Sequence, residues 1–180
     1  MPQATSEKDI YLPLPATLRK SRLMNATELY MQIEMDEAPL NYKPGQFVQV
    51  SVPGIGEAPI SISSSPTFEN GFELVVRKAG NVTHHIHEMK AGAKLGIRGP
   101  FGNTYPVEES KGKDLVFICG GIGLVPQRSF INYVLDHRDD YGHVTVLMGT
   151  KCRTQRFFHS EIAEWKRRDD IHFIETVDEA

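Results

Sequence analysis

The spacing of hydrophobic residues changes once along this chain, and the change predicts two structural units. From residue 17 to residue 99, short segments of alternating apolar and polar residues are separated by glycine, proline, asparagine and serine. This pattern is typical of antiparallel strands joined by tight turns. The expected strands are residues 17–24, 28–35, 46–52, 60–63, 71–78 and 94–98. The first unit is therefore predicted to be a six-stranded antiparallel barrel.

One short helix interrupts these strands. We expect it to begin near Thr83, whose hydroxyl can cap the first turn. It should continue through residues 84–90 and stop at Gly92, because glycine readily takes the backbone conformation that ends a helix.

Beyond residue 112, strands and helices alternate. Residues 115–119 are all apolar, as in a parallel strand that is covered on both faces. Helices are expected at about 124–136 and 159–168, and further strands at 143–149 and 171–176. This β-α-β-α-β order predicts a parallel sheet with right-handed crossovers. The fold class is thus a β barrel followed by a partial α/β unit.

These two units define the expected domain limits. The charged segment 106–113 is the expected linker between them. We divide the chain into an N-terminal tail at 1–13, the barrel at 14–108 and the partial parallel-sheet unit at 109–180.

Composition narrows the possible partners. The chain has 180 residues, of which 40% are hydrophobic and 24% charged, as in ordinary globular proteins. Its net charge of −3 and the absence of a basic stripe with interleaved aromatic residues argue against nucleic-acid binding. No apolar run approaches the roughly 20 residues that span a bilayer. The first residues lack a basic segment followed by an apolar one, so we expect no membrane insertion and a cytoplasmic location.

A glycine-rich turn follows the apolar run at 115–119. Gly120, Gly121 and Gly123 permit positive φ and let a ligand approach bare backbone, and Pro126 suits a first helical turn. Unpaired N–H groups and the helix dipole would then face a dinucleotide pyrophosphate. Ile122 lies inside the same turn. The alternative is that the glycines only form a tight connection.

Two segments of the first unit fit a flavin site. In residues 57–63, an extended strand would present its backbone and the Ser61 hydroxyl to a flavin edge, with Ile60 as a flat apolar surface. In residues 77–83, a strand ends at Gly80 and leads into the short helix. Backbone N–H groups there and the Thr83 hydroxyl can bind pyrophosphate, and nearby basic side chains can offset its charge.

Other residues near these segments leave alternatives open. Phe101, in the turn at 99–103, either closes one side of the flavin pocket or completes the barrel. The serines at 63–65 either donate hydrogen bonds to the flavin or form the turn before Pro66. Three histidines, at 84, 85 and 87, have no further ligands at a recognisable spacing, so polar contacts beside the flavin or surface positions explain them better than a metal does.

In their order and spacing these segments resemble the ferredoxin reductase superfamily of FAD-dependent electron-transfer proteins. Residues 56–66 look most like the gamma subunit of cytoplasmic hydrogenase/sulfur reductases and the B subunit of anaerobic sulfite reductase. Electron-transfer subunits of dihydroorotate dehydrogenase are more distant relatives. The resemblance runs from about residue 14 to the C terminus and implies a FAD-binding barrel followed by a nicotinamide-dinucleotide domain.

Position by position, residues 58–61 occupy the arginine-x-tyrosine-serine motif of this superfamily. Ala58 lacks the guanidinium and Ile60 replaces the aromatic ring, and both changes recur in the hydrogenase-like branch. Residues 80–83 match the phosphate-binding glycine-x-x-serine/threonine. The candidate FAD-binding residues are Ala58, Pro59, Ile60, Ser61, Ser63, Val76, Arg77, Lys78, Gly80, Asn81, Val82, Thr83 and Phe101. The candidate nicotinamide-dinucleotide residues are Gly120, Gly121, Ile122, Gly123 and Pro126.

The end of the second parallel strand does not separate NAD from NADP. Dinucleotide folds often have an acidic residue there, whereas this chain has Lys151 and Arg153. These two residues fit either a 2′-phosphate or a solvated loop.

The resemblance implies a FAD-dependent oxidoreductase subunit that passes electrons between NAD(P)H and a partner redox protein or iron–sulfur centre. No side-chain acid or nucleophile is required, because the cofactors carry the chemistry. Related proteins continue beyond the third parallel strand, so a shortened chain or a sheet completed by a homo-oligomer or hetero-complex is expected. One alternative is a non-catalytic FAD-binding electron-transfer or assembly module with an incomplete nicotinamide site, and another is a fragment without cofactor.

Overall fold

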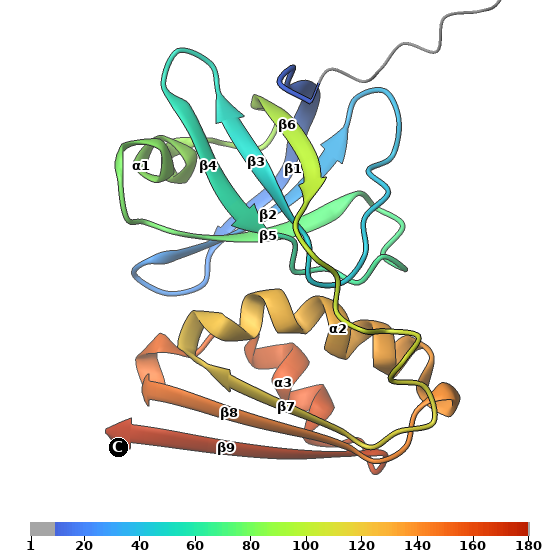
Figure 1. Ribbon diagram of the computed structural model, residues 1–180. Helices are drawn as coiled ribbons and strands as arrows, with labels where there is room; N and C mark the ends of the chain where they lie inside the picture. Colours follow the sequence, from blue (N-terminus) through green and yellow to red (C-terminus); the bar gives the residue numbers. More distant parts are fainter. Residues whose placement is uncertain (1–9, 180) are drawn as a thin grey trace, which may run out of the picture.

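Six antiparallel strands form the upper layer of the molecule (Figure 1). The computed structural model describes residues 10–179, so most of the expected N-terminal tail lies outside the described residues. The strands are β1 (Leu14–Leu23), β2 (Glu28–Met35), β3 (Phe47–Val52), β4 (Gly56–Ser61), β5 (Phe72–Arg77) and β6 (Lys94–Phe101). They pair in the order β4-β3-β6-β1-β2-β5. A bridge between Ile62 and Leu74 joins the two ends of this order, which closes the predicted barrel.

The barrel core is formed by inward-facing residues of these strands and by Ile86 of the helix α1 (Asn81–Glu88). Alternation along the strands places one face of each strand in this core, as on any half-buried pleated sheet. The fully buried members include Leu18, Met31, Ile33, Val48, Val50, Phe72 and Leu74.

Several boundaries differ from the sequence-based expectation: β4 covers residues 56–61 instead of 60–63, and α1 ends at Glu88 instead of continuing to residue 90. Helix α1 begins two residues before Thr83, because Gly80 takes an extended conformation (φ −159°) and serves as the cap residue. Strand β6 continues three residues past the expected end at residue 98, because Phe101 still pairs with Phe47 of β3. The expected turn at 99–103 therefore begins as strand.

Three parallel strands form the lower sheet, in the order β7 (Leu115–Gly120), β8 (Val144–Cys152) and β9 (Ile171–Glu179). Helices α2 (Leu124–Asp136) and α3 (His159–Trp165) lie on the same side of this sheet, between it and the barrel (Figure 1). Short 3-10 turns are η1 (Gly121–Gly123), η2 (Arg138–Asp140) and η3 (Arg153–Gln155). The predicted β-α-β-α-β order is confirmed.

The expectation that β7 is covered on both faces is wrong for the described chain. Phe117 and Cys119 are buried, whereas Val116 and Ile118 are 62% and 69% exposed. Two successive right-handed crossovers place both helices on one face of the sheet. The other face of the sheet is thus open, and the apolar run alternates in burial like an antiparallel strand.

The barrel and the α/β unit share a packed contact. Val75 of β5 belongs to the buried cluster of the α/β unit, and Tyr30 packs against the same cluster. Tyr105, in the connecting segment, stacks on Phe130 of α2 with ring centroids 5.4 Å apart. The Ser129 hydroxyl donates to the Ser64 carbonyl over 2.5 Å. These contacts make the two units one assembly. No helix in residues 10–179 is both long and apolar enough to cross a bilayer.

Candidate functional site

The C-terminal end of β4 lies in one row with two aromatic residues of neighbouring strands. Ser61 pairs with Phe47 of β3, and Phe47 pairs with Phe101 of β6. The two phenylalanine rings are 5.8 Å apart. Ser61 and Phe101 are both half-buried, so this row presents a partly open surface with hydroxyl and aromatic groups, whereas Ile60 pairs with Val48 and packs against the barrel core.

An ion pair fixes the start of the same strand. Arg98 Nε donates to Glu57 Oε1 over 3.0 Å, and a second bond joins Arg98 Nη2 to the other carboxylate oxygen. This hydrogen bonding holds the pKa of Glu57 below its ordinary value. Ala58, the next residue, is half-buried, and Pro59 is exposed. The strand that carries the candidate flavin residues is thus anchored on β6.

The first turn of α1 has backbone N–H groups that are open to an anion. Helix geometry leaves the N–H groups of Asn81, Val82 and Thr83 without acceptors inside the helix. The first turn carries no acidic side chain. A Cβ built on Gly80 would meet nothing within 4 Å, so the backbone is open at this residue. We call residues 80–83 the phosphate turn.

The Thr83 hydroxyl organises this turn. It accepts hydrogen bonds from the backbone N–H groups of Gly80 (2.8 Å) and Ala79 (2.9 Å), and it donates to the Gly80 carbonyl (2.9 Å). A threonine hydroxyl has one proton and two lone pairs, so its bonding capacity is used within the turn. In this structure the backbone N–H groups, rather than the hydroxyl, are available to a phosphate.

Arg77 and Lys78, the two cations beside the phosphate turn, are not equally available to bind a phosphate. Arg77 Nε donates to the buried carboxylate of Glu28 over 2.6 Å, which commits part of its charge. Burial alone would raise the pKa of Glu28, but hydrogen bonds from Thr27, Arg77 and Asn25 outweigh it, and the net shift is downward. Lys78 is exposed at the end of the strand. Lys78 is therefore the more available cation.

Two other candidate cofactor residues, Val76 and Ser63, have buried side chains that contact only protein atoms among the described residues. The Val76 side chain is fully buried in the barrel core, and its carbonyl oxygen lies 2.8 Å from His87 Nε2. Ser63 is also fully buried, and its hydroxyl accepts a hydrogen bond from Arg128 of α2. The structure thus gives the Ser63 side chain a role in joining the two units. The side chains of both residues lie away from solvent.

The neighbouring serines also form the turn before Pro66. Ser64 Oγ lies 2.7 Å from the Tyr42 hydroxyl and accepts the Glu73 N–H over 2.9 Å. Ser65 Oγ accepts a hydrogen bond from the Thr67 hydroxyl over 2.6 Å. The contact between Ser65 and Thr67 is that of a turn, whereas the Ser64 hydroxyl contacts Tyr42 and Glu73 of β5.

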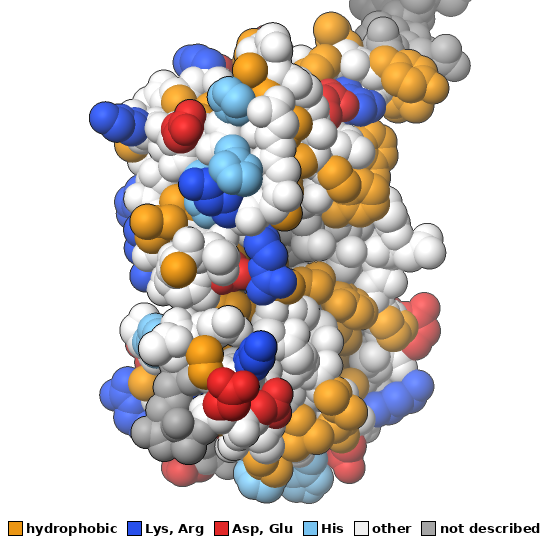
Figure 2. Space-filling view, turned by 90° about the vertical axis from the view of Figure 1, so that its left-hand side faces the viewer, with side chains coloured by type: hydrophobic (Ala, Val, Ile, Leu, Met, Phe, Trp, Pro, Cys, Tyr) orange, Lys and Arg blue, Asp and Glu red, His pale blue; other side chains and the backbone are white. Residues whose placement is uncertain are grey.

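The histidines of α1 each lie beside a different backbone carbonyl. His84 Nδ1 is 2.7 Å from the Gly80 oxygen, and His85 Nδ1 is 2.9 Å from the Asn81 oxygen. Within the described residues, no group of three or more acidic, histidine or cysteine side chains is placed to hold a metal. Figure 2 shows pale-blue histidine side chains gathered over the upper unit on this face of the molecule.

The second candidate turn, residues 120–123, opens at the end of β7. Gly121 has a φ of +51°, which favours glycine, whereas Gly120 (φ −117°) and Gly123 (φ −60°) have ordinary conformations. A Cβ built on any of these three glycines would meet nothing within 4 Å. The open space leaves room for a ligand, and the positive φ of Gly121 also serves a tight connection. We call this segment the glycine turn.

The glycine turn leads directly into α2. Helix α2 begins at Leu124, so Pro126 lies in its first turn, as predicted, and Ile122 is half-buried against the core of the α/β unit. Behind the turn, the Gln127 side chain donates to the Ile118 carbonyl over 2.8 Å and accepts from the Cys119 thiol. These bonds tie the start of α2 to the end of β7.

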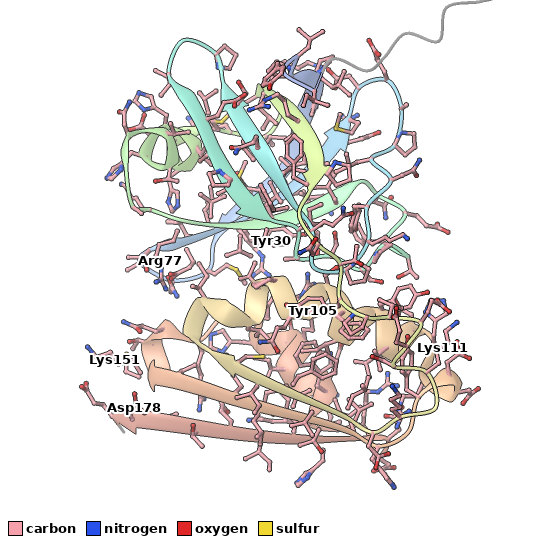
Figure 3. All side chains as sticks on the ribbon, viewed as in Figure 1. Tyr30, Arg77, Tyr105, Lys111, Lys151 and Asp178 are labelled. Carbon is pink, nitrogen blue, oxygen red and sulfur yellow. The ribbon has the colours of Figure 1, made fainter. Side chains whose placement is uncertain are left out.

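The end of β8 lies on the same side of the molecule. Figure 3 shows Arg77 of the barrel and Lys151 of β8 on the left-hand side, one above the other. Lys151 is exposed. A cavity of ≈ 700 Å³ lies elsewhere, between β1, β2 and α3, and the predicted cofactor residues do not line it.

The sequence did not identify the charged cluster around Arg128, which joins the barrel to α2. Arg128 lies 2.6 Å from Glu73 of β5 and 2.7 Å from Glu161 of α3. One signal was available: Glu73 stands between Phe72 and Leu74 in an otherwise apolar strand. A charge in such a strand needs a partner when it is buried.

Comparison with known proteins identifies the domain family of each half of the chain. The family model described as oxidoreductase FAD-binding domain matches residues 16–105, and the oxidoreductase NAD-binding domain matches residues 117–180. Among curated proteins, the chain is 42% identical over 139 residues to sulfhydrogenase 1 subunit gamma of Pyrococcus furiosus, covering 76% of this chain and 48% of that protein. It is 28% identical over 161 residues to a probable dihydroorotate dehydrogenase B electron transfer subunit of Methanocella arvoryzae, covering 89% and 52%. The chain spans about half the length of these relatives.

Solved structures show the same fold. A cytochrome P450 reductase from Amycolatopsis superposes with a TM-score of 0.80 at 23% identity, covering 94% of this chain and 53% of that one. The FAD/NAD-binding domain of a nitric oxide dioxygenase from Vibrio cholerae gives a TM-score of 0.78 at 19% identity, covering 91% and 73%. With its FAD-binding barrel and its NAD-binding sheet, this chain belongs to the ferredoxin reductase superfamily of flavin oxidoreductases.

Proposed function

We propose that this chain is the cofactor-binding part of a FAD-dependent oxidoreductase subunit that passes electrons between NAD(P)H and a partner redox protein or iron–sulfur centre. The observation that carries the proposal is a pair of open turns, the phosphate turn and the glycine turn. Both lie at the left-hand side of the molecule in Figure 1. Both also lie at a helix start, where backbone N–H groups and the helix dipole favour anions.

The phosphate turn would hold the pyrophosphate of FAD. The free N–H groups of Asn81, Val82 and Thr83 supply the donors, and Lys78 supplies a nearby positive charge. Ala58 has no positive charge, whereas the superfamily motif has an arginine at this position. The backbone N–H groups of the phosphate turn would therefore contribute a larger share of the FAD-binding energy. The flavin ring would lie against the row formed by Ser61, Phe47 and Phe101, next to Ile60 in the same strand.

The glycine turn would hold the pyrophosphate of a nicotinamide dinucleotide. Gly121 and Gly123 leave bare backbone beside the start of α2, so a phosphate can approach the N–H groups closely. The side chains at the end of β8, including the exposed Lys151, would lie near the adenosine end of the nucleotide, as expected for such folds.

Bound FAD would supply the conversion between two-electron hydride transfer and single-electron transfer. The residues of this chain would bind and orient the two cofactors and exclude water from the space between them. This division of labour requires no side-chain acid or nucleophile. The names of the relatives, "subunit gamma" and "electron transfer subunit", support a place in a larger complex.

Two further assignments accompany this proposal. We place the boundary between the FAD-binding and nucleotide-binding units at residues 108 and 109, within the segment between β6 and β7. We also assign the chain to the cytoplasm, and the free thiols of Cys119 and Cys152 are compatible with its reducing conditions.

A visible absorption spectrum tests the proposal directly. Protein incubated with FAD and freed of excess cofactor should retain flavin bands at about one FAD per chain, and NADH or NADPH should bleach them in the absence of oxygen. Retained flavin that neither nucleotide reduces would favour a non-catalytic electron-transfer or assembly module. Absence of retained flavin would overturn both accounts.

The variant Gly123→Ala tests the glycine turn separately. Because Gly123 has a helical φ of −60° and open space at its Cβ position, alanine should fit without strain and leave stability unchanged or slightly raised. The added methyl group would obstruct a phosphate, so nucleotide affinity should fall about tenfold, or 1.4 kcal/mol, with unchanged FAD affinity. Nucleotide binding equal to that of the wild type would contradict this assignment.

A further inference from the structure

Arg128 is a buried cation on the second turn of α2, and residues of three elements surround it. Its Nη1 donates to Glu73 Oε2 over 2.6 Å and to the Ser63 carbonyl over 3.0 Å. Its Nε donates to Glu161 Oε2 over 2.7 Å, and its guanidinium lies 4.3 Å from the centre of the Phe158 ring. Only 10% of the side chain is exposed. The fork of the guanidinium therefore has fixed partners on β5, on α3 and in the segment after β4.

The two carboxylates are themselves held in place. The Tyr30 hydroxyl donates to Glu73 Oε1 over 2.5 Å, so each oxygen of Glu73 has a partner. Asn132 donates to Glu161 Oε1 over 2.8 Å. Burial, together with the neighbouring Glu73, raises the pKa of Tyr30, which keeps its hydroxyl protonated as a donor. In Figure 3 Tyr30 lies at the level where the barrel meets α2. This arrangement leaves Arg128 little freedom to change its direction.

The position of Arg128 in the sequence connects it to both cofactor sites. It follows Gly123, the last residue of the glycine turn, by five residues, or about 7 Å along a helix. Its partner Ser63 follows Ser61, the end of the candidate flavin strand, by two residues, or about 7 Å along a strand. One guanidinium thus joins the end of the flavin strand to the start of the nucleotide-binding helix.

We propose that Arg128 is a positioning residue that sets the distance and angle between the flavin site and the nicotinamide site. This inference rests on the proposed function. Because hydride transfer requires reacting atoms about 3–3.5 Å apart, a small shift of α2 relative to β4 is enough to slow it greatly. The planar fork of arginine can hold Ser63, Glu73 and Glu161 together, whereas a lysine ammonium cannot reproduce its geometry.

Two substitutions and a matched control test the proposal. Arg128→Met removes the charge and the fork, and Arg128→Lys keeps the charge alone. The control is Arg138→Met, because the contacts of Arg138 with the described residues lie within the α/β unit, namely with the carbonyls of Asp170 and Tyr141 and with the Asp170 carboxylate. All three variants are measured for FAD affinity, for apparent nucleotide KM and for the rate of flavin reduction at saturating NADH or NADPH.

A structural readout accompanies the kinetics. Spin labels on Cys152 of β8 and on a cysteine introduced as Lys90→Cys report the distance between the barrel and the α/β unit, with or without cofactor. Cys119 is buried, so labelling is directed to the other two thiols. In both Arg128 variants the distance distribution should broaden or shift, and in Arg138→Met it should match the wild type.

The kinetic result should separate positioning from binding. We expect flavin reduction to fall about tenfold to a hundredfold in Arg128→Met, with a smaller loss or none in FAD affinity and nucleotide KM. Arg128→Lys should show most of this loss. If Arg128→Met does not fold, Arg128→Lys and Ser63→Ala, which removes only one hydroxyl contact, supply the same comparison. Wild-type distances and rates in the variants would overturn the proposal.

Failure of the proposed function would give a different result from failure of the Arg128 proposal. If the wild-type protein binds no FAD or is not reduced by nucleotide, the assigned reaction is wrong. The label distances in the cofactor-free variants still decide whether Arg128 fixes the two units.

Discussion

The Thr83 hydroxyl provides the sharpest single test of the FAD site. Three hydrogen bonds converge on it: two from the N–H groups of Ala79 and Gly80, and one to the Gly80 carbonyl. Replacement by valine keeps the branched shape and removes all three bonds. Loss of a comparable capping hydroxyl costs about 0.5–2 kcal/mol of stability.

The same loss should appear in FAD affinity. The N–H groups that face a phosphate are aligned only while the turn is closed, so FAD binding must restore the order that Thr83→Val removes. A free-energy loss of about 0.5–2 kcal/mol corresponds to a decrease of roughly 2- to 30-fold in FAD affinity. Quenching of flavin fluorescence on binding gives the dissociation constant, and amide hydrogen exchange of α1 without cofactor shows whether the turn has opened.

Two controls make the result interpretable. Thr83→Ser keeps the hydroxyl and should restore most of the affinity. Thr104→Val makes the same chemical change at an exposed position in the segment after β6 and should leave FAD binding unchanged. Equal FAD affinity in Thr83→Val and the wild type would refute the reasoning, because it would mean that the phosphate turn is not part of the site.

Three further predictions concern buried groups. Tyr42→Phe should lower the free energy of unfolding in urea by about 1–3 kcal/mol, because the buried Ser65 carbonyl loses a donor at 2.7 Å; an unchanged value would contradict this. Burial raises the pKa of Cys119 to about 11, so at pH 8 a thiol reagent should modify Cys152 in the folded protein and both cysteines only in denaturant. Because the folded pKa of Glu28 is lowered, its ionised form stabilises the protein above pH 4.5, and this contribution is lost as the pH falls through the folded pKa. The stability difference between wild type and Glu28→Gln should therefore shrink on acidification, and a constant difference would argue against the ion pair.

Hydrophobic periodicity predicted most of the architecture because the burial of one face of each strand or helix sets the period of its apolar residues. The limits of β2, Glu28–Met35, and of α2, Leu124–Asp136, agree with the sequence-based expectation to the residue. In both cases turn-forming residues flank a clear apolar period, so local and tertiary preferences agree. The division into an antiparallel barrel and a parallel sheet followed from the same signal.

The errors have both local and distant causes. The cap of α1 was assigned to Thr83, but its hydroxyl reaches back to Gly80, so the helix starts earlier. The run at 115–119 was expected to be covered on both faces, yet the apolar residues do not specify which faces receive helices. The buried contact between Ser63 and Arg128 joins residues 65 positions apart, and no local pattern indicates such a pairing.

The chemistry of the Arg128 contact argues for orientation rather than stability. Removing an arginine and two carboxylates from water is expensive, and apolar residues of similar size often stabilise an interface equally well. The surrounding contact already contains Val75, Phe158 and the Tyr30 ring, which could pack without buried charges. Apolar packing is non-directional and tolerates sliding, whereas the bonds of Arg128 to Glu73 and Ser63 fix both a distance and an angle. A cluster of buried charges at the junction of two cofactor sites is thus the arrangement expected when relative placement, and not only cohesion, is required.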